Sequence, residues 1–296
     1  MLPKRARFWL VLFVIVSLLS LGSSCSKDED DEDEGPDDTT GTTAAVPYQS
    51  KGNEGTITGN VTFSGAAPAP KPIDMSADAA CSTKNPNATA EDLVVKDGKL
   101  EYAFIYIKDG QTADGKKISG LSFPVPGDSV KLDQDGCHYK PHVLGIQTKQ
   151  KFEVVNSDPT AHNVNVQPNS NPKWNQSQPP SAPPIVKSFD RAETLIPVKC
   201  NQHPWMKAYI GVLNHPFYGV SREDGTFEIK GVPPGKYTVV AWHEKWKGEK
   251  TMEVTVPEKG STTADFAFDG SAMASVLDGG SLEVLPALEL PMLMQH

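Results

Sequence analysis

Apolar and polar residues alternate over short stretches of the chain, and this period of two predicts half-buried β-strands instead of long helices. Gly55 to Phe63 shows the alternation near the start of the chain. The pattern returns in the C-terminal part, where the turn signals Asp224-Gly225 and Pro233-Pro234-Gly235 separate the apolar stretches. The four strands expected there are Thr226 to Ile229, Tyr237 to Trp242, Thr251 to Val256 and Thr263 to Phe268.

Composition and charge support this interpretation. The 296 residues include 25 Pro and 24 Gly, which favours short strands joined by turns, and the length allows one large or two modest domains. The formal net charge of −9 argues against a nucleic-acid partner. Much of this charge is local, because nine acidic residues lie between Ser26 and Asp38. We expect residues 25–54 to form an acidic, disordered tether.

The first 24 residues have the parts of a secretory signal peptide: a basic start, the apolar run Phe8 to Leu21, and small residues before Cys25. The apolar run is short for a membrane span. A Cys directly after small residues resembles the bacterial lipoprotein signal, which implies a lipid on Cys25 that holds the protein to a membrane. A plain cleaved signal is the alternative. We expect an exported protein at the periplasmic face or the cell surface.

The most informative stretch of the chain places a thiol, an imidazole and a thioether at Cys200, His203 and Met206. Sulfur ligands with imidazole suit copper, and two His, one Cys and a weak axial Met make up blue-copper electron-transfer sites. A second histidine is available at His162, which is followed by Asn163 and lies between two apolar-alternating segments. Each residue alone is more often structural, but together they indicate a metal site.

This spacing resembles the cupredoxin family, and in particular amicyanin, over residues 118–216. The resemblance implies one mononuclear type 1 copper, with His162, Cys200 and His203 as equatorial ligands and Met206 as the axial ligand. Asn163 would tie the His162 strand to the ligand loop. Residues 168–184 contain six prolines and are expected to form a surface loop. By the same resemblance, an apolar patch for a redox partner protein would be built by Pro204, Trp205 and Trp174.

Two of the four cysteines remain after Cys25 and Cys200 are assigned. In an exported protein such a leftover pair indicates a disulfide, here between Cys81 and Cys137. The alternative is a second metal half-site that combines Cys137 with His138 and His142.

The C-terminal strands resemble the transthyretin-like, carboxypeptidase regulatory-like sandwich, whose opening strand would be Gly55 to Phe63. We therefore expect residues 55–117 and 217–269 to form one sandwich, with the cupredoxin domain inserted between them. Two consecutive domains are the alternative. Residues 270–296 are a tail to which no function is assigned. The expected fold is all-β: a Greek-key cupredoxin β-sandwich plus a transthyretin-like or Ig-like β-sandwich.

The sequence contains no Ser-His-Asp order, no HExxH, no phosphate loop and no dinucleotide fingerprint. We expect no enzyme. The expected function is one-electron transfer by a membrane-anchored copper protein. Copper binding for trafficking, or a surface interaction module without redox chemistry, are the alternatives.

Overall fold

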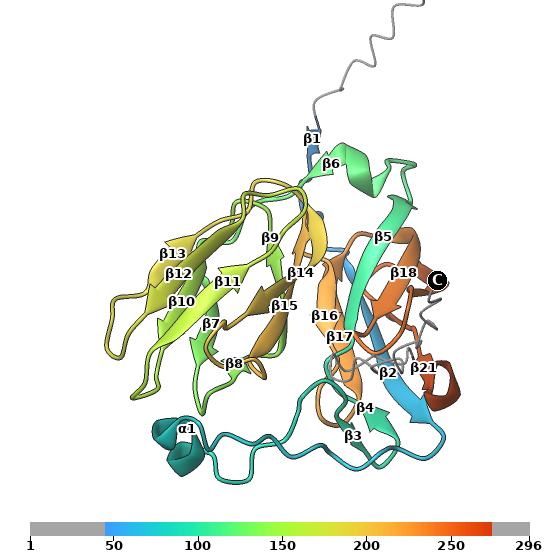
Figure 1. Cartoon of the computed structure of the whole chain (residues 1–296). Helices are drawn as coiled ribbons and strands as arrows, with labels where there is room; N and C mark the ends of the chain where they lie inside the picture. The colour runs from blue at the N-terminus through green and yellow to red at the C-terminus, as the bar shows by residue number, and fades with distance from the viewer. Residues whose placement is uncertain (1–44, 274–296) are drawn as a thin grey trace, which may run out of the picture. The chain divides into compact units, whose positions relative to one another are not determined.

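The structure is a computed structural model, and it describes residues 45–273. Their regular structure is almost entirely β-strand, with one short α-helix, α1 (Ala79–Lys84), and two 3-10 turns, η1 (Ile118–Gly120) and η2 (Gly270–Ala272). The all-β expectation is confirmed (Figure 1). Among these residues there is no helix with the length and apolar character that a membrane crossing requires.

Nine strands between residues 130 and 213 form a β-sandwich, drawn in green to yellow-brown in Figure 1. It is called the ligand sandwich below because it contains the four candidate metal ligands. One sheet has the order β13-β10-β7-β8 and the other the order β12-β11-β14-β15-β9. The first sheet contains β7 (Val130–Gln134), β8 (Tyr139–Lys140), β10 (Phe152–Asn156) and β13 (Ile185–Lys187). The second contains β9 (Val143–Gln147), β11 (His162–Val166), β12 (Trp174–Gln178), β14 (Glu193–Lys199) and β15 (Lys207–Leu213).

The chain crosses from one sheet of the ligand sandwich to the other between β10 and β11, so Phe152 and Val154 face Val164 and Val166 across one core. These side chains are fully buried, as the two-residue alternation requires. Burying a side chain of this size stabilises a fold by about 1.5–3 kcal/mol. The sandwich therefore forms a rigid frame for the loops at its ends.

A second sandwich, called the companion sandwich below, is built from strands near both ends of the described chain. β2 (Gly55–Ser64) pairs antiparallel with β17 (Thr226–Val232), and parallel with β20 (Ser261–Thr263) and β21 (Phe266–Asp269). In Figure 1 these are the blue strand and its orange neighbours. The other strands are β3 (Val95–Lys96), β4 (Lys99–Leu100), β5 (Phe104–Thr112), β16 (Tyr218–Val220), β18 (Gly235–Trp242) and β19 (Lys250–Val256). In the sequence, the strands of the ligand sandwich therefore lie between the N-terminal and C-terminal strands of the companion sandwich.

The last strand expected from the sequence, Thr263 to Phe268, is two strands, β20 and β21. Both pair with β2, but the pairing is interrupted where the Asp265 carboxylate accepts the backbone N–H of Asn60 at 2.8 Å. At this point a side-chain oxygen replaces a backbone carbonyl as the hydrogen-bond acceptor, and the strand is divided in two.

The structure differs from the expected ranges at two places. Ile118, Leu121 and Phe123 pack in the core of the companion sandwich, and β6 (Leu121–Ser122) pairs with β1 (Val46–Pro47). Conversely, the segment before β3 leaves its own sandwich: Met75, Cys81 and Ala88 are buried in the core of the ligand sandwich. This segment, residues 71–90, includes α1 and is called the cover segment below. Side-chain burial, which the strand pattern does not report, decides both differences.

The Pro-rich stretch 168–184 is not entirely a loop, which corrects the expectation. Its middle forms the edge strand β12, which pairs with β11 in the register Val166↔Trp174 and His162↔Gln178. The prolines fall on either side of the strand, at the edge of the sheet, where missing N–H groups cost little.

The two sandwiches pack through glycines that admit aromatic rings. A Cβ on Gly145 in β9 would lie 2.2 Å from the ring of Tyr218, and one on Gly211 in β15 would lie 2.2 Å from the ring of Phe104. Both approaches are closer than any real Cβ contact. The interface therefore requires these two positions to lack side chains.

Candidate metal centre

The four residues expected to bind metal lie at one end of the ligand sandwich. His162 is the first residue of β11, Cys200 directly follows β14, and Met206 directly precedes β15. β14 and β15 form a hairpin in which Lys199 pairs with Lys207, so Cys200 to Met206 is its connecting loop. This loop is closed by hydrogen bonds from Cys200 N to Met206 O at 3.2 Å and from Met206 N to His203 O at 2.9 Å.

The structure brings the candidate nitrogen and sulfur ligands together. His162 Nδ1 lies 2.9 Å from His203 Nδ1, and Cys200 Sγ lies 3.7 Å from His203 Nδ1. One ligand atom from each of the three residues lies within 4.8 Å of the others. All three side chains are buried, and Met206 is fully buried in the adjacent core. This is a compact N₂S group with a thioether residue in the same loop.

Asn163 links the His162 strand to the ligand loop. Its side-chain Oδ1 accepts the backbone N–H of Asn201 at 2.7 Å and lies 3.4 Å from Cys200 Sγ, while its Nδ2 donates to Asn175 Oδ1 at 2.7 Å. The amide therefore fixes the start of the loop and contacts the sulfur directly.

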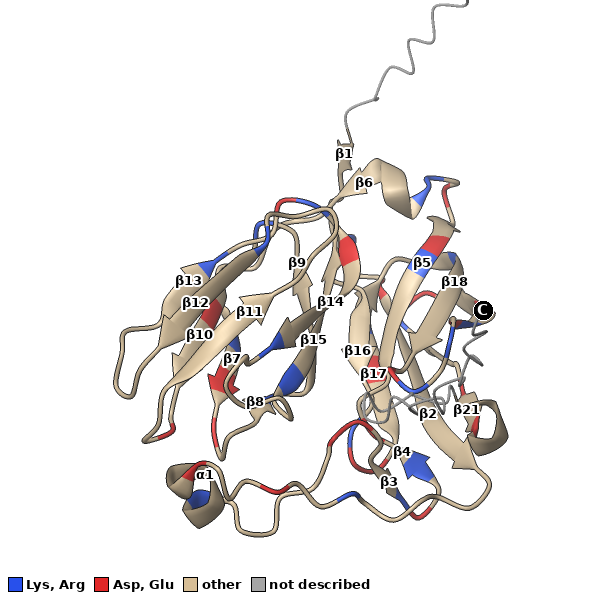
Figure 2. Ribbon diagram, viewed as in Figure 1, with Lys and Arg blue, Asp and Glu red and all other residues tan. Residues whose placement is uncertain are grey.

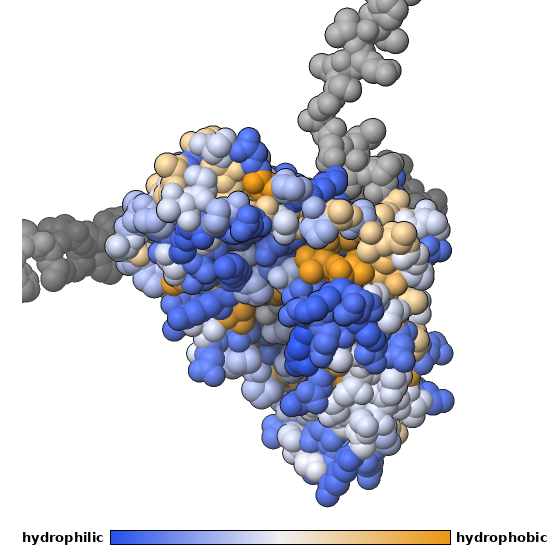
Figure 3. Space-filling model, turned by 90° about the horizontal axis from the view of Figure 1, so that it is seen from below, coloured by the Kyte–Doolittle hydropathy of each residue, from blue (hydrophilic) through white to orange (hydrophobic). Residues whose placement is uncertain are grey.

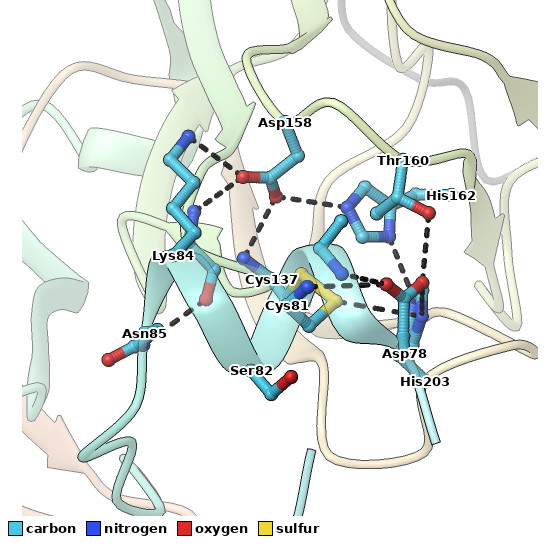
Figure 4. Close-up of a disulfide and its surroundings, with 12 residues drawn as sticks. Asp78, Cys81, Ser82, Lys84, Asn85, Cys137, Asp158, Thr160, His162 and His203 are labelled. Atoms are coloured by element: carbon cyan, nitrogen blue, oxygen red, sulfur yellow. Dashed lines mark hydrogen bonds and ion pairs between the residues drawn. A yellow bond between two sulfur atoms is a disulfide. The ribbon is translucent and has the colours of Figure 1, made fainter. Parts of the chain in front are cut away.

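Two carboxylates that were not predicted from the sequence contact the two histidines of the candidate centre. His162 Nε2 lies 2.9 Å from Asp158 Oδ2, and His203 Nε2 lies 3.1 Å from Asp78 Oδ2 (Figure 4). Asp158 is fully buried and lies only four residues before His162. This short spacing could have indicated a contact between the two side chains. Asp78 is 125 residues from His203 in the chain, and the ligand motif contains no sign of it.

The hydrogen bonds of the centre form one consistent chain. Asp158 accepts from His162 Nε2, the Nδ1 atoms of His162 and His203 share one hydrogen bond, and His203 Nε2 donates to Asp78. Each ring thus points Nε2 at a carboxylate and Nδ1 at the other ring. We assign the protons from this network.

Electrostatics of the centre favour an ionised sulfur. Burial works against charge at Cys200, but hydrogen bonds with His162 and nearby backbone groups lower its pKa to about 6. Burial also opposes charge at His162, yet hydrogen bonds with Asp158 and Cys200 raise its pKa to about 9. The pKa of Asp158 lies well below its usual range, because hydrogen bonds from His162 and Lys84 outweigh the effect of its burial. A thiolate is the form of Cys that binds metal.

Cys81 and Cys137 form a disulfide, with Cα atoms 5.5 Å apart. It joins the cover segment to the ligand sandwich directly beside the centre, since Cys81 Sγ lies 3.8 Å from His203 Nε2. Cys200 is buried and is the free cysteine of the described region.

The alternative second metal half-site is not assembled. His138 Nδ1 lies 3.0 Å from Gly136 O, whereas His142 bonds to Glu244 of the companion sandwich and to the carbonyl of Lys207. No group of metal-ligating side chains within residues 45–273 includes either histidine. His142 instead links the two sandwiches.

Of the three residues expected to form a partner patch, Trp205 lies beside His203, whereas Trp174 lies further along the sheet from His162. The Trp205 ring lies 5.1 Å from the His203 ring, and its Nε1 donates to Cys137 O at 3.0 Å. Trp174 lies four residues along the register from the partner of His162, about 13 Å away along the strand. Pro204 is exposed, but His203 is only 5% exposed. Figure 3, which views the molecule from below, shows a mostly hydrophilic surface with small apolar areas.

Cys25, the signal segment and most of the acidic tether lie outside the described residues, as do residues 274–296 of the tail.

Comparisons with known proteins add two likenesses. Residues 218–267 match the family model described as BOS complex subunit NOMO1-like, second beta sandwich domain. No curated protein sequence matches the chain.

Parts of the chain are also similar to solved structures. The Cu-containing nitrite reductase from Thermus scotoductus SA-01 is 22% identical, with TM-score 0.26, over 29% of this chain and 22% of that chain. A purple cupredoxin from Nitrosopumilus maritimus is 17% identical, with TM-score 0.24, over 28% of this chain and 98% of that one. Amicyanin from Paracoccus versutus is 18% identical, with TM-score 0.26, over 36% and 96% respectively.

Proposed function

We propose that the ligand sandwich binds one copper ion and passes single electrons to and from a redox partner protein. One observation supports this most: two histidine Nδ1 atoms and a buried cysteine sulfur converge, with a buried methionine in the same short loop. Copper bound to such ligands cycles between Cu(II) and Cu(I) and so stores one electron.

The donor set fits copper better than the other common metals. Mg²⁺ and Ca²⁺ bind oxygen ligands, whereas the converging atoms here are nitrogen and sulfur. Zinc also accepts His and Cys, but a thioether is a soft ligand that favours copper. Met206 is fully buried, and its backbone bonds to both Cys200 and His203, so it belongs to the same loop as the other two ligands.

The protein holds its candidate ligands with little freedom. His162 is fixed on a paired strand, the hairpin loop is closed by its own backbone, and Asn163 ties strand to loop. A site whose ligands cannot rearrange suits an ion that must gain and lose an electron quickly. Burial of all the ligands also keeps water from the centre.

The location of the protein belongs to the same proposal. A lipid on Cys25 would hold the folded part at a membrane, with the acidic segment as spacer, and an oxidising compartment would suit the Cys81–Cys137 disulfide. Copper trafficking by the same residues is less well supported. Delivery needs an accessible ion, while His162, Cys200 and His203 are all at least 95% buried.

The test is copper titration of the purified protein. We expect one equivalent of Cu(II) to produce an intense visible thiolate-to-copper band and an axial or rhombic paramagnetic-resonance signal. Cys200→Ser should lose the band because the thiolate is removed. Equal treatment with Zn²⁺ gives the colourless control. Absence of the band in the wild type, or its survival in Cys200→Ser, would contradict the proposal.

A further inference from the structure

The cover segment directs its polar groups at the candidate centre. Asp78 contacts His203, and Lys84 Nζ lies 2.8 Å from Asp158 Oδ1, the carboxylate that holds His162. Asn85 Nδ2 donates to Gly136 O at 3.2 Å. Figure 2 shows both acidic and basic positions at α1, and Figure 4 shows them turned toward the centre. The cover segment thus contacts His203 directly and reaches His162 through Asp158.

We propose that Asp78 and Asp158 are positioning residues of the copper centre: each carboxylate holds one histidine as the Nε2–H tautomer, with Nδ1 turned toward the metal. This rests on the proposed function, because it assigns residues that act through His203 and His162. Ring orientation and tautomer of metal-bound histidines are commonly set by such a partner on the second nitrogen.

The two carboxylate oxygens of Asp78 bond to different groups. Its Oδ1 caps α1 by accepting the backbone N–H groups of Ala80 at 2.8 Å and Cys81 at 3.2 Å. Its Oδ2 accepts from His203 and from the Thr160 hydroxyl at 2.8 Å. The same side chain therefore starts the helix and orients the ligand, and the Cys81–Cys137 disulfide keeps that helix in place.

Asp158 performs the same task on the other ring from inside the ligand sandwich. It is fully buried and accepts the backbone N–H groups of Gly136 and Cys137, each at 2.8 Å, as well as His162 Nε2. A carboxylate with this many donors cannot turn away from His162. The disulfide bond is thus next to both positioning carboxylates, through Cys81 on one side and the Cys137 amide on the other.

The chemical consequence concerns which nitrogen remains free. A neutral imidazole has one N–H and one lone pair, so a carboxylate at Nε2 takes the N–H and leaves the lone pair on Nδ1. The two Nδ1 atoms already lie 2.9 Å apart in one shared hydrogen bond. Displacing that single proton leaves two nitrogen lone pairs that point at one place.

Asp78→Asn gives a sharp test because it keeps the shape and the helix cap. Asn is as good an N-cap as Asp, so its oxygen can still serve α1. Its NH₂ group then faces His203 Nε2, where a donor meets a donor and the Nδ1–H tautomer becomes favoured. Asp74→Asn is the matched control, because Asp74 lies on the same segment, is exposed, and only caps Ser76.

The experiment measures copper affinity of the full chain by competition with a chelator, for both oxidation states. We expect Asp78→Asn to bind copper about 10–100-fold more weakly than the wild type, and Asp74→Asn to bind it equally well. Nitrogen-15 spectra of the Cu(I)-loaded wild type should show Nε2–H on both His162 and His203, and the His203 signal should change in Asp78→Asn alone.

The possible outcomes test copper binding and the roles of Asp78 and Asp158 separately. A wild type that binds no copper overturns the proposed function. A wild type that binds copper while Asp78→Asn matches Asp74→Asn overturns the positioning role of Asp78. Nδ1–H signals in the loaded wild type overturn it for whichever ring carries them. Because Asp158→Asn removes support from two backbone amides as well, the ring-nitrogen signal of His162 in the wild type is the test for Asp158.

Discussion

The two sandwiches bury histidines in opposite ways. In the ligand sandwich, His162 has a carboxylate partner, and its pKa is raised to about 9 despite burial. In the companion sandwich and at its margin, His215 and His243 bond to backbone groups: their Nδ1 atoms accept the N–H groups of Phe217 and Lys245. The rings also bond to the backbone of Ile107 and Glu101, respectively. Burial then lowers the pKa of His215 to about 4 and that of His243 to about 3.

The difference shows that burial alone does not identify a functional histidine. His162, His203, His215 and His243 are all less than 9% exposed. What separates these four is the partner of the second nitrogen, which is a carboxylate for His162 and His203 and a backbone group for His215 and His243. His215 stacks on Phe217 and His243 packs against Trp246, as core side chains do.

The largest effect that we predict on stability comes from removal of the Cys81–Cys137 disulfide, which lies in the ligand sandwich. The double variant Cys81→Ser with Cys137→Ser should lose about 4 kcal/mol of unfolding free energy, because the bond closes a loop of 56 residues. Denaturant unfolding measures the loss. Amide exchange should rise more in β7 and β10 than in β17 and β19. A loss below 1 kcal/mol, or equal changes in both sandwiches, would contradict the assignment.

The pH dependence of stability tests the companion side. His215 has a folded pKa near 4, below the usual 6.5, so the unfolded chain binds the proton first as the pH falls. Stability therefore decreases as the pH falls from 6.5 to 4, by about 3 kcal/mol for this group. His215→Gln should remove that part of the slope. An unchanged slope in the variant would show that His215 is not held neutral.

The interface between the sandwiches should tolerate no side chain at Gly211. Gly211→Ala places a Cβ against the ring of Phe104 and should cost about 1–3 kcal/mol through overpacking. Gly120→Ala is the control, because a Cβ there meets nothing within 4 Å. Melting temperatures of the two variants give the comparison. Equal values would mean that the sandwiches do not pack as closely as they do here.

The candidate ligands could be predicted from the sequence, but most of the residues that support them could not. The spacing of Cys200, His203 and Met206 marks a hairpin loop, and His162 followed by Asn163 marks the strand beside it. Asp78 could not be predicted, because the contact depends on how a distant segment packs. The edge strand that contains Trp174 was not predicted either, because prolines lie on both sides of it, and its register places Trp174 away from His162.

The domain boundaries show the same limit. Alternation located β2, β18 and β19 of the companion sandwich within one or two residues, because the apolar and polar sides of a half-buried strand alternate in its own sequence. The cover segment has almost no regular structure of its own, so its packing on the other sandwich left no periodic signal. Short-range pattern predicts strands, and long-range packing decides which unit a loop joins.

The central claim is that the chain carries electrons by copper, and voltammetry of the copper-loaded protein tests it most directly. We predict a reversible one-electron Cu(II)/Cu(I) couple that persists over repeated cycles in the presence of a Cu(I) chelator, because the ligands are fixed and buried. Loss of the signal on the first reduction, with copper recovered on the chelator, would contradict electron transfer and favour copper delivery.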